Sequence, residues 1–401
     1  MEQIDISKIE TINIGIVGHI DHGKTTLLQQ LSGKWADTHS EELKRGITIK
    51  LGYADALIRE ENNKLTIDKN SQGKPKRYIT FIDAPGHEML MATMLLGASI
   101  IDAAILVVAA NEGIKPQTQE HLTALEAKNI KNIIIAQNKI DLVTKEQAQE
   151  NYKKIKEFLK GTIAENAPII PICAQQGINL EAIFEELCKL EIPKFNKEDK
   201  PIFYIARSFD VNKPGTPVEQ LHGGIFGGVL KQGSLKVGDT IEIKPGYSYK
   251  KHNELKYKTI YSKIISLHKG NYNLNQVFPG GSIAIETELD PTLTKADSLS
   301  GAVISTKNNL PEIIDKIKID YKLFKKMQQD SKIEEIQDLK ISEMLMLSAN
   351  TSITVGKIIK KNNNDIELEL KIPIVPLKNE PIGIARNING HWRLIGYGNL
   401  R

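Results

Sequence analysis

Residues 18–25 have the residue types and spacing of a phosphate-binding loop, Gly18-His19-Ile20-Asp21-His22-Gly23-Lys24-Thr25. The glycines allow backbone N–H groups to turn inward around phosphate oxygens at a helix N-terminus, where the helix dipole also favours negative charge. Lys24 would neutralise the β- and γ-phosphates of a nucleoside triphosphate, and the Thr25 hydroxyl would bind Mg²⁺. A glycine turn with a chance lysine is the alternative. A predicted strand at residues 12–17 and a predicted helix containing Leu27, Leu28 and Leu31 favour the P-loop.

Two further segments would complete a magnesium triphosphate site. Thr48 ends the run Arg45-Gly46-Ile47-Thr48 and could join the Mg²⁺ shell when a γ-phosphate is present, as in an ordered first switch. Asp83 follows a predicted strand at residues 78–82 and would hold Mg²⁺ through water, while the Gly86 N–H would sense the γ-phosphate. Alone, Thr48 could be a surface residue and Asp83 a helix cap. Their order after the P-loop favours the functional interpretation.

His87 is the candidate catalytic residue because it adjoins the expected γ-phosphate sensor, where a side chain can orient the attacking water. An imidazole can form hydrogen bonds with water in either protonation state near neutral pH. The alternative is a solvent-exposed histidine at the start of a helix.

Base selection is predicted from Asn138-Lys139-Ile140-Asp141, which follows a predicted strand at residues 133–136. The Asp141 carboxylate can accept hydrogen bonds from N1–H and the exocyclic amine of guanine together, and adenine lacks both donors. Asn138 would bind the base edge and the loop, and the aliphatic stem of Lys139 would cover the base. The nucleotide is therefore expected to be GTP or GDP.

The elements that must position these residues alternate between short β-branched runs and amphipathic helical patterns up to about residue 190. This pattern predicts a doubly wound α/β domain with a mostly parallel sheet, and the motifs above predict that it is a P-loop GTPase domain. Beyond a lysine-rich, proline-bounded stretch at residues 193–201 the helical period largely vanishes. Short apolar runs punctuated by Gly and Pro then predict antiparallel barrels or sandwiches, and some two hundred residues are long for one small barrel, which suggests two domains. We expect a GTP-binding domain at 1–198 and barrel domains at 199–309 and 310–401.

Composition limits the class of protein further. The 401 residues carry 53 Lys and Arg against 49 Asp and Glu, a net charge of +4 that neither demands nor excludes a nucleic-acid partner. The start of the chain lacks the pattern of a signal peptide, and the apolar run at residues 100–110 is too short to cross a bilayer. The two cysteines, Cys173 and Cys188, suit a reducing compartment. We expect a cytoplasmic protein without a membrane partner.

The P-loop, Arg-Gly-Ile-Thr, Asp-Ala-Pro-Gly-His and Asn-Lys-Ile-Asp motifs together resemble the translational GTPase superfamily. Longer segments resemble its family of initiation factor 2 gamma subunits, including residues 39–46, 90–98, 161–171, 207–215 and 392–398. This resemblance runs nearly end to end and implies a GTP-binding domain followed by two β-barrels. It also implies that the GTP form carries methionylated initiator tRNA to the small ribosomal subunit, with alpha and beta subunits as partners. The implied cofactors are GTP or GDP and Mg²⁺.

The same resemblance implies roles for further residues. Asp21 and Gly46 would take part in magnesium binding, and Ile20 and Ile47 would form a hydrophobic gate beside the catalytic histidine. The backbone N–H that contacts the guanine carbonyl would fall in Cys173-Ala174-Gln175. The GTP-binding set would comprise Asp21, His22, Gly23, Lys24, Thr25, Thr26, Gly86, Asn138, Lys139, Asp141, Cys173, Ala174 and Gln175.

Three features depart from the family pattern. Residues 59–77 contain no cysteine where the family usually carries a zinc knuckle, so we expect a polar loop without zinc. Cys173 replaces a serine, which should leave the Ala174 N–H in place. The segment Asn111-Glu112-Gly113-Ile114-Lys115-Pro116 differs from the usual proline-rich loop, which puts the contacts of that loop in question.

Other functions share these motifs. An elongation-type or selenocysteine-specific tRNA carrier is the alternative within the same fold, although the latter usually bears extra C-terminal RNA-binding domains. A GTPase subunit of a sulfate-activating enzyme and a pure scaffold are further alternatives. One basic and aromatic cluster could contact RNA or form a solvated hairpin: Lys244, Tyr247, Tyr249, Lys250, Lys251, His252, Lys256, Tyr257 and Lys258.

Overall fold

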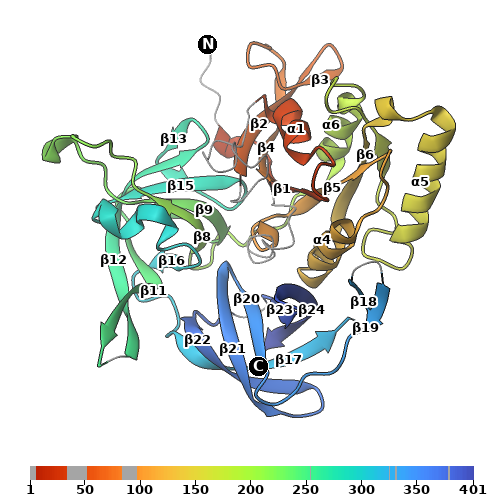
Figure 1. Ribbon diagram of the computed structural model, residues 1–401. Helices are drawn as coiled ribbons and strands as arrows, with labels where there is room; N and C mark the ends of the chain where they lie inside the picture. The colour runs from red at the N-terminus through yellow and green to blue at the C-terminus, as the bar shows by residue number, and fades with distance from the viewer. Residues whose placement is uncertain are drawn as a thin grey trace.

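The computed structural model describes residues 6–33, 52–83, 97–252, 254–324, 326–329, 332–377 and 380–401. Three units follow one another along the chain: a sheet covered by helices and then two β-barrels (Figure 1). The family-level prediction of an α/β GTPase domain followed by two antiparallel barrels is confirmed.

The first unit contains a seven-stranded mixed sheet in the order β3-β2-β4-β1-β5-β6-β7. The strands from β4 to β7 pair in parallel, whereas β2 and β3 are antiparallel. The strands are β1 (Thr11–Gly18), β2 (Gly52–Glu61), β3 (Lys64–Thr66), β4 (Lys74–Asp83), β5 (Ala103–Ala109), β6 (Asn132–Asn138) and β7 (Ile169–Pro171). The helices are α1 (Lys24–Ser32), α4 (Pro116–Ala127), α5 (Lys145–Leu159) and α6 (Leu180–Lys189).

Helices cover both faces of this sheet, as the sequence predicts. Apolar side chains of α1 and α6, such as Leu28 and Ile183, pack into one core cluster with β1 and β4. Those of α4 and α5, such as Leu125 and Ile155, pack into a second cluster on the other face. Strand β5, an interior strand of the sheet, is buried along its whole length, which explains its continuous apolar sequence.

The prediction of a polar loop at residues 59–77 is wrong. The segment contains the end of β2, all of β3 and the start of β4, which form a β-hairpin extension of the sheet. Leu65 and Ile67 pack against the core. Arg77 is buried because its guanidinium donates to the Leu187 and Leu190 carbonyls at the end of α6. The absence of zinc stays a prediction.

The second unit closes into a barrel through the strand order β11-β16-β8-β9-β15-β12, because β11 also pairs with β12. Its core contains Phe203, Phe226 and Leu267. The strands are β8 (Ile202–Phe209), β9 (Ile225–Gln232), β10 (Leu235–Lys236), β11 (Thr240–Lys251), β12 (Glu254–Lys269), β13 (Tyr272–Leu274), β14 (Gln276–Val277), β15 (Ser282–Thr287) and β16 (Val303–Thr306).

The third unit is a closed barrel in the order β17-β22-β21-β20-β23-β24. A short hairpin, β18 with β19, extends from it. The strands are β17 (Ile314–Leu323), β18 (Lys326–Gln329), β19 (Lys332–Glu335), β20 (Met344–Ala349), β21 (Ser352–Lys361), β22 (Asp365–Ile374), β23 (Ile382–Ile388) and β24 (His391–Leu400).

The outer part of the β11–β12 hairpin carries most of the basic and aromatic cluster. Tyr247 and Tyr249 are exposed and their rings are tilted against each other, with centroids 5.9 Å apart. Lys244 does not belong to this exposed cluster, because its side chain is buried and donates to the Leu310 and Pro311 carbonyls and to Glu312. Contact of the remaining cluster with RNA stays a prediction.

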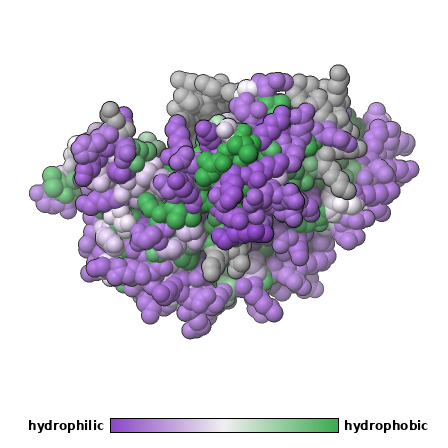
Figure 2. All heavy atoms as spheres, turned by 90° about the horizontal axis from the view of Figure 1, so that it is seen from below, coloured by the Kyte–Doolittle hydropathy of each residue, from purple (hydrophilic) through white to green (hydrophobic). Residues whose placement is uncertain are grey.

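The molecular surface is largely hydrophilic when seen from below, with apolar side chains in small, interspersed patches (Figure 2). Within the described part of the chain, no helix combines the length and the apolar character needed to cross a membrane.

Candidate nucleotide-binding site

The predicted P-loop and the predicted base-binding motif meet at one edge of the sheet. In the register of the parallel strands, Ile16 of β1 lies beside Asp83 of β4, Gly18 lies beside Val107 of β5, and Ala109 lies beside Asn138 of β6. The carboxyl ends of these strands therefore point to the same place, which is where open α/β sheets bind ligands.

The P-loop needs glycine at both of its ends. Gly18 has φ +140°, and a Cβ built there would lie 2.4 Å from the Val107 carbonyl oxygen. Gly23 has φ +90°, and a Cβ built there would lie 2.4 Å from Asn138 Nδ2. Between them the exposed Asp21 also has a left-handed conformation, with φ +59°. Helix α1 begins directly after Gly23, so its N-terminus faces the loop.

Lys24 and Thr25, which are predicted to bind the triphosphate and Mg²⁺, follow the P-loop at the start of α1. Lys24 is buried, and its Nζ donates to the His19 carbonyl across the loop at 2.8 Å. Thr25 Oγ1 donates to Asp83 Oδ2 at 2.9 Å, and Asp83 is fully buried. A hydroxyl and a carboxylate converging beside a phosphate loop are oxygen donors of the kind that Mg²⁺ prefers. These residues fit the ion, which phosphates and water would complete.

Among the residues that the structure describes, no group of three or more His, Cys, Asp or Glu side chains could hold a metal ion. Mg²⁺ in nucleotide sites is usually held by one or two protein groups plus phosphates, so this finding is compatible with the donor pair above.

The His22 imidazole lies beneath the P-loop. It is fully buried, with Nδ1 3.3 Å from the Val107 carbonyl oxygen. Burial lowers the pKa of His22 to about 4, so the ring is neutral at physiological pH. The ring cannot supply positive charge to a phosphate, and any contact of His22 with nucleotide would come from its backbone.

Asn138 links the base-binding motif to the P-loop. Its Nδ2 donates to the His22 carbonyl at 2.9 Å, and its Oδ1 accepts from the Ala174 N–H at 2.9 Å. One side chain thus holds together three segments that are far apart in the sequence. Lys139 follows in a left-handed conformation, with φ +61°, and the exposed Asp141 lies in a short 3₁₀ turn (Ile140–Leu142).

The loop after β7 supplies the third part of the predicted base site. Ile178 N–H donates to the Cys173 carbonyl, which closes a tight loop that exposes Gln175. Cys173 is buried, and burial together with a hydrogen bond to Asp141 raises the pKa of its thiol. The thiol is therefore protonated beside the carboxylate that is predicted to bind guanine.

Glu112 is a residue of this site that the motifs did not indicate. Its carboxylate lies 3.6 Å from Lys139 Nζ, 3.7 Å from Lys115 Nζ and 4.0 Å from His22 Nε2. Partial burial opposes ionisation of Glu112, whereas the Lys139 and Lys115 ammonium groups favour it, and the pKa of Glu112 is lowered. The ion pair with Glu112 therefore helps to position the side chain of Lys139, whose aliphatic part is expected to cover the base.

Several predicted residues lie outside the described residues: Gly46, Ile47, Thr48, Gly86 and His87. Ile20, the other residue of the predicted gate, is half-buried, and its N–H donates to Gln117 Oε1 at 3.1 Å. Thr26 is half-buried in the first turn of α1. The roles assigned to all these residues stay predictions.

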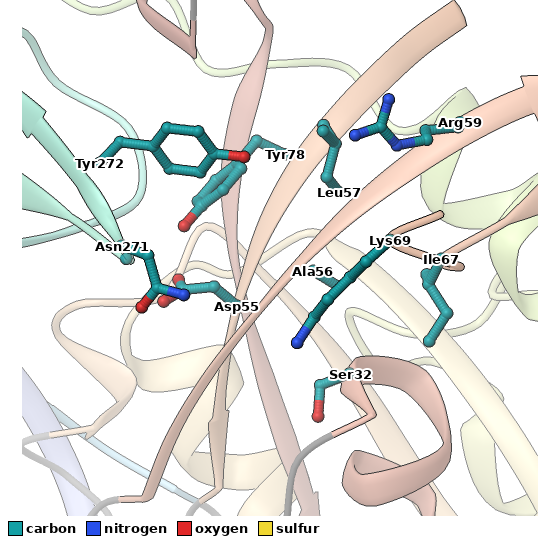
Figure 3. Close-up of a pocket in the computed structure, with 11 residues that line it drawn as sticks. Ser32, Asp55, Ala56, Leu57, Arg59, Ile67, Lys69, Tyr78, Asn271 and Tyr272 are labelled. Atoms are coloured by element: carbon teal, nitrogen blue, oxygen red, sulfur yellow. The ribbon is translucent and has the colours of Figure 1, made fainter. Parts of the chain in front are cut away.

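A separate pocket of about 210 Å³ lies where the α/β unit meets the first barrel (Figure 3). Asp55, Tyr78, Asn271 and Tyr272 line one side of it, and Arg59 and Lys69 line the other. The seam beside it is tight: Thr80 Oγ1 donates to Asp55 Oδ1 at 2.7 Å and accepts from the Ser282 N–H at 3.1 Å. This pocket is lined by none of the P-loop residues.

A covered α/β sheet with a P-loop and a guanine-type motif at its carboxyl edge, followed by two barrels, defines a GTPase of the translational class. The family description "Elongation factor Tu GTP binding domain" matches residues 9–193, and "Initiation factor eIF2 gamma, C terminal" matches residues 315–400. The chain belongs to the gamma-subunit family of translation initiation factor 2. It is accordingly a GTP-hydrolysing protein of translation initiation.

Relatives of similar sequence support this assignment, and two solved structures share the fold. The gamma subunit from Methanococcus vannielii is 50% identical over 96% of this chain and 97% of its own length. That from Pyrococcus furiosus is 47% identical over 97% of both chains. A bacterial selenocysteine-specific elongation factor, EF-Sec, has a TM-score of 0.77 at 24% identity, but the chain spans only 58% of that protein. Elongation factor SelB from Methanococcus maripaludis, in complex with the GTP analogue GppNHp, has a TM-score of 0.73 at 23% identity and is covered over 79% of its length. These last two show the fold alone.

Proposed function

We propose that this GTPase binds methionylated initiator tRNA in its GTP-bound state, delivers it to the small ribosomal subunit and hydrolyses GTP on release. Its partners would be the alpha and beta subunits of the same factor, and its place of action the cytoplasm. The observation that carries the proposal is the similarity, along nearly the whole chain, to gamma subunits of translation initiation factor 2.

The site geometry supports the nucleotide part of this proposal. Asn138 fastens the P-loop to the base-binding loops, so guanine recognition and phosphate binding share one rigid frame. Thr25 and Asp83 would hold Mg²⁺, with Asp21, Gly46 and Thr48 as further participants. Bound Mg²⁺ would neutralise charge on the phosphates. The proposed domains are 1–198, 199–309 and 310–401.

The decisive experiment compares methionylated initiator tRNA with elongator methionyl-tRNA, each with a non-hydrolysable GTP analogue and with GDP, at fixed salt because salt strongly affects RNA binding. Preference for the initiator in the GTP-like state supports the proposal. Equal binding of both tRNAs favours an elongation-type carrier. Binding of neither, with the alpha subunit present, favours the sulfate-activation alternative.

His87 is proposed to orient the attacking water, with Ile20 and Ile47 as the gate beside it. Replacing His87 by alanine should slow stimulated GTP hydrolysis much more than it weakens GTP binding. Turnover equal to that of the unmodified protein would remove His87 from the mechanism. A selenocysteine-specific carrier is tested in parallel by offering selenocysteinyl-tRNA, since fold similarity alone does not separate the two functions.

A further inference from the structure

Two side chains of helix α4 hold the backbone of the P-loop from outside the nucleotide motifs. His121 Nδ1 accepts a hydrogen bond from the Gly18 N–H at 2.7 Å, and Gln117 Oε1 accepts one from the Ile20 N–H at 3.1 Å. The two residues are four positions apart on α4 and therefore lie on one stripe of the helix.

These hydrogen bonds fix the directions in which two N–H groups of the P-loop point. A P-loop works only if its N–H groups point in defined directions, some toward phosphate oxygens and the others toward protein acceptors. Gly18 and Ile20 direct theirs toward α4. His121 is buried, so loss of its acceptor nitrogen would leave the Gly18 N–H without a partner in the protein interior. The two side chains thus help to set the shape of the phosphate cradle without belonging to it.

Residues on the neighbouring stripe of α4 contact the last barrel. Glu120 forms an ion pair with Arg393 of β24, and both side chains are largely buried. Ala124 and Ala127 pack against an apolar group of the barrel comprising Met346, Ala385 and Leu394. At the end of the helix, the buried Lys128 donates to the carbonyls of Ser348 and Pro381. Helix α4 therefore lies between the P-loop and the last barrel and contacts both.

We propose that Gln117 and His121 are positioning residues of the nucleotide site, and that the Glu120–Arg393 ion pair makes their position depend on the last barrel. A displacement of that barrel would shift α4 and, through these two hydrogen bonds, the P-loop. This inference concerns nucleotide binding and does not depend on which tRNA the protein carries.

The first test measures release of a fluorescent GDP analogue from the full chain. His121→Leu removes the acceptor of the Gly18 N–H. We expect GDP release to become about tenfold faster, because a buried backbone N–H would lose its hydrogen-bond partner. His121→Asn keeps an acceptor near the position of Nδ1 and should restore most of the slow release. Gln117→Met, at a half-buried position that should tolerate the change, should accelerate release about threefold.

A general loss of stability is separated from positioning by comparing nucleotides. Affinity for GDP should fall more than affinity for GMP, because GMP lacks the β-phosphate that the P-loop would hold. Glu126→Gln, an exposed change on the same helix, is the control and should leave both affinities unchanged. Release at the unmodified rate in Gln117→Met and His121→Leu would overturn the proposal. So would an equal loss of affinity for GDP and GMP.

The second test addresses the last barrel. Arg393→Ala should accelerate GDP release about threefold, and should have a clearly smaller effect once His121 is leucine, because His121 forms one of the two hydrogen bonds through which the coupling runs. Arg386→Ala is a matched control: it breaks a comparably buried pair with Glu343 that lies within the barrel. Unchanged release in Arg393→Ala, effects that add in the double variant, or equal acceleration in Arg386→Ala would each refute the coupling.

Discussion

The stability of the α/β unit should fall between pH 8 and pH 5 because two of its histidines are buried in the neutral form. Burial lowers the pKa of His22 to about 4 and that of His121 to about 3, from an ordinary value of 6.5. The unfolded chain therefore binds more protons than the folded chain below pH 6.5, and stability must decrease as the pH falls.

The magnitude follows from the pKa values. Each unit of difference corresponds to about 1.4 kcal/mol, so at pH 5 each imidazole costs about 2 kcal/mol of unfolding free energy, and the pair about 4 kcal/mol. That is a large part of the roughly 5–15 kcal/mol that a typical domain possesses. Above pH 7 both contributions are fully present.

Urea unfolding from pH 8 to pH 5, followed by hydrogen exchange of peptides from β1, β5 and β6, reports on this unit alone. His121→Asn removes one titrating group and should halve the loss. His252→Asn is the control, because His252 is exposed and its φ of +51° suits asparagine. An unfolding free energy that stays constant down to pH 5, or an unchanged loss in His121→Asn, would refute the assignment of neutral buried rings.

Three further changes test other parts of the structure. Asp141→Asn should shift the preference from guanine toward xanthine nucleotides in competition with fluorescent GDP, and an unchanged preference would remove Asp141 from base recognition. Gly270→Ala should destabilise the protein by about 1–3 kcal/mol in thermal unfolding, because Gly270 has φ +56° and the new Cβ would lie 2.3 Å from the Tyr78 hydroxyl. Gly161→Ala is the control: Gly161 also has a positive φ, +70°, but a Cβ there would meet no atom within 4 Å. An equal loss of stability in Gly161→Ala would exclude the contact with Tyr78 as the cause. Lys244→Met should cost about 1–3 kcal/mol by leaving buried carbonyls without a donor, whereas the exposed Lys250→Met should be neutral in the same measurement.

Features carried by short, contiguous segments were predictable from the sequence. The strand before the P-loop, the helix that follows it and the strand before Asn138 all appear where the sequence places them. Their signal is local, since hydrophobic period and glycine spacing suffice. Placing Asp83 beside Thr25 also follows from the rule that parallel strands align their carboxyl ends.

Features that depend on distant contacts were not predictable. Arg77 is one of the polar residues that led to the prediction of a loop at residues 59–77. It is buried because carbonyls at the end of α6, more than a hundred positions away, accept its hydrogen bonds. Lys244 looks like a member of an exposed basic cluster, but the segment at residues 310–312 buries it. Gln117 and His121 have no motif at all, because their partners are backbone groups about a hundred residues earlier. Composition cannot reveal which charge or amide finds such a partner.

Each of the three units contacts the other two, and these contacts limit how the protein can respond to nucleotide. Ser282 of the first barrel binds Thr80 of the α/β unit, and Tyr204 of the first barrel donates to Asn350 of the last barrel. The last barrel returns to the α/β unit through α4 and Arg393. A rotation of the last barrel away from the rest would therefore break two seams together and expose the apolar cluster beneath them. A small displacement of α4 that keeps its contacts with Arg393 would break neither seam and would reach Gly18 and Ile20 through His121 and Gln117. Helix α4 is therefore the route that we propose from the last barrel to the nucleotide site.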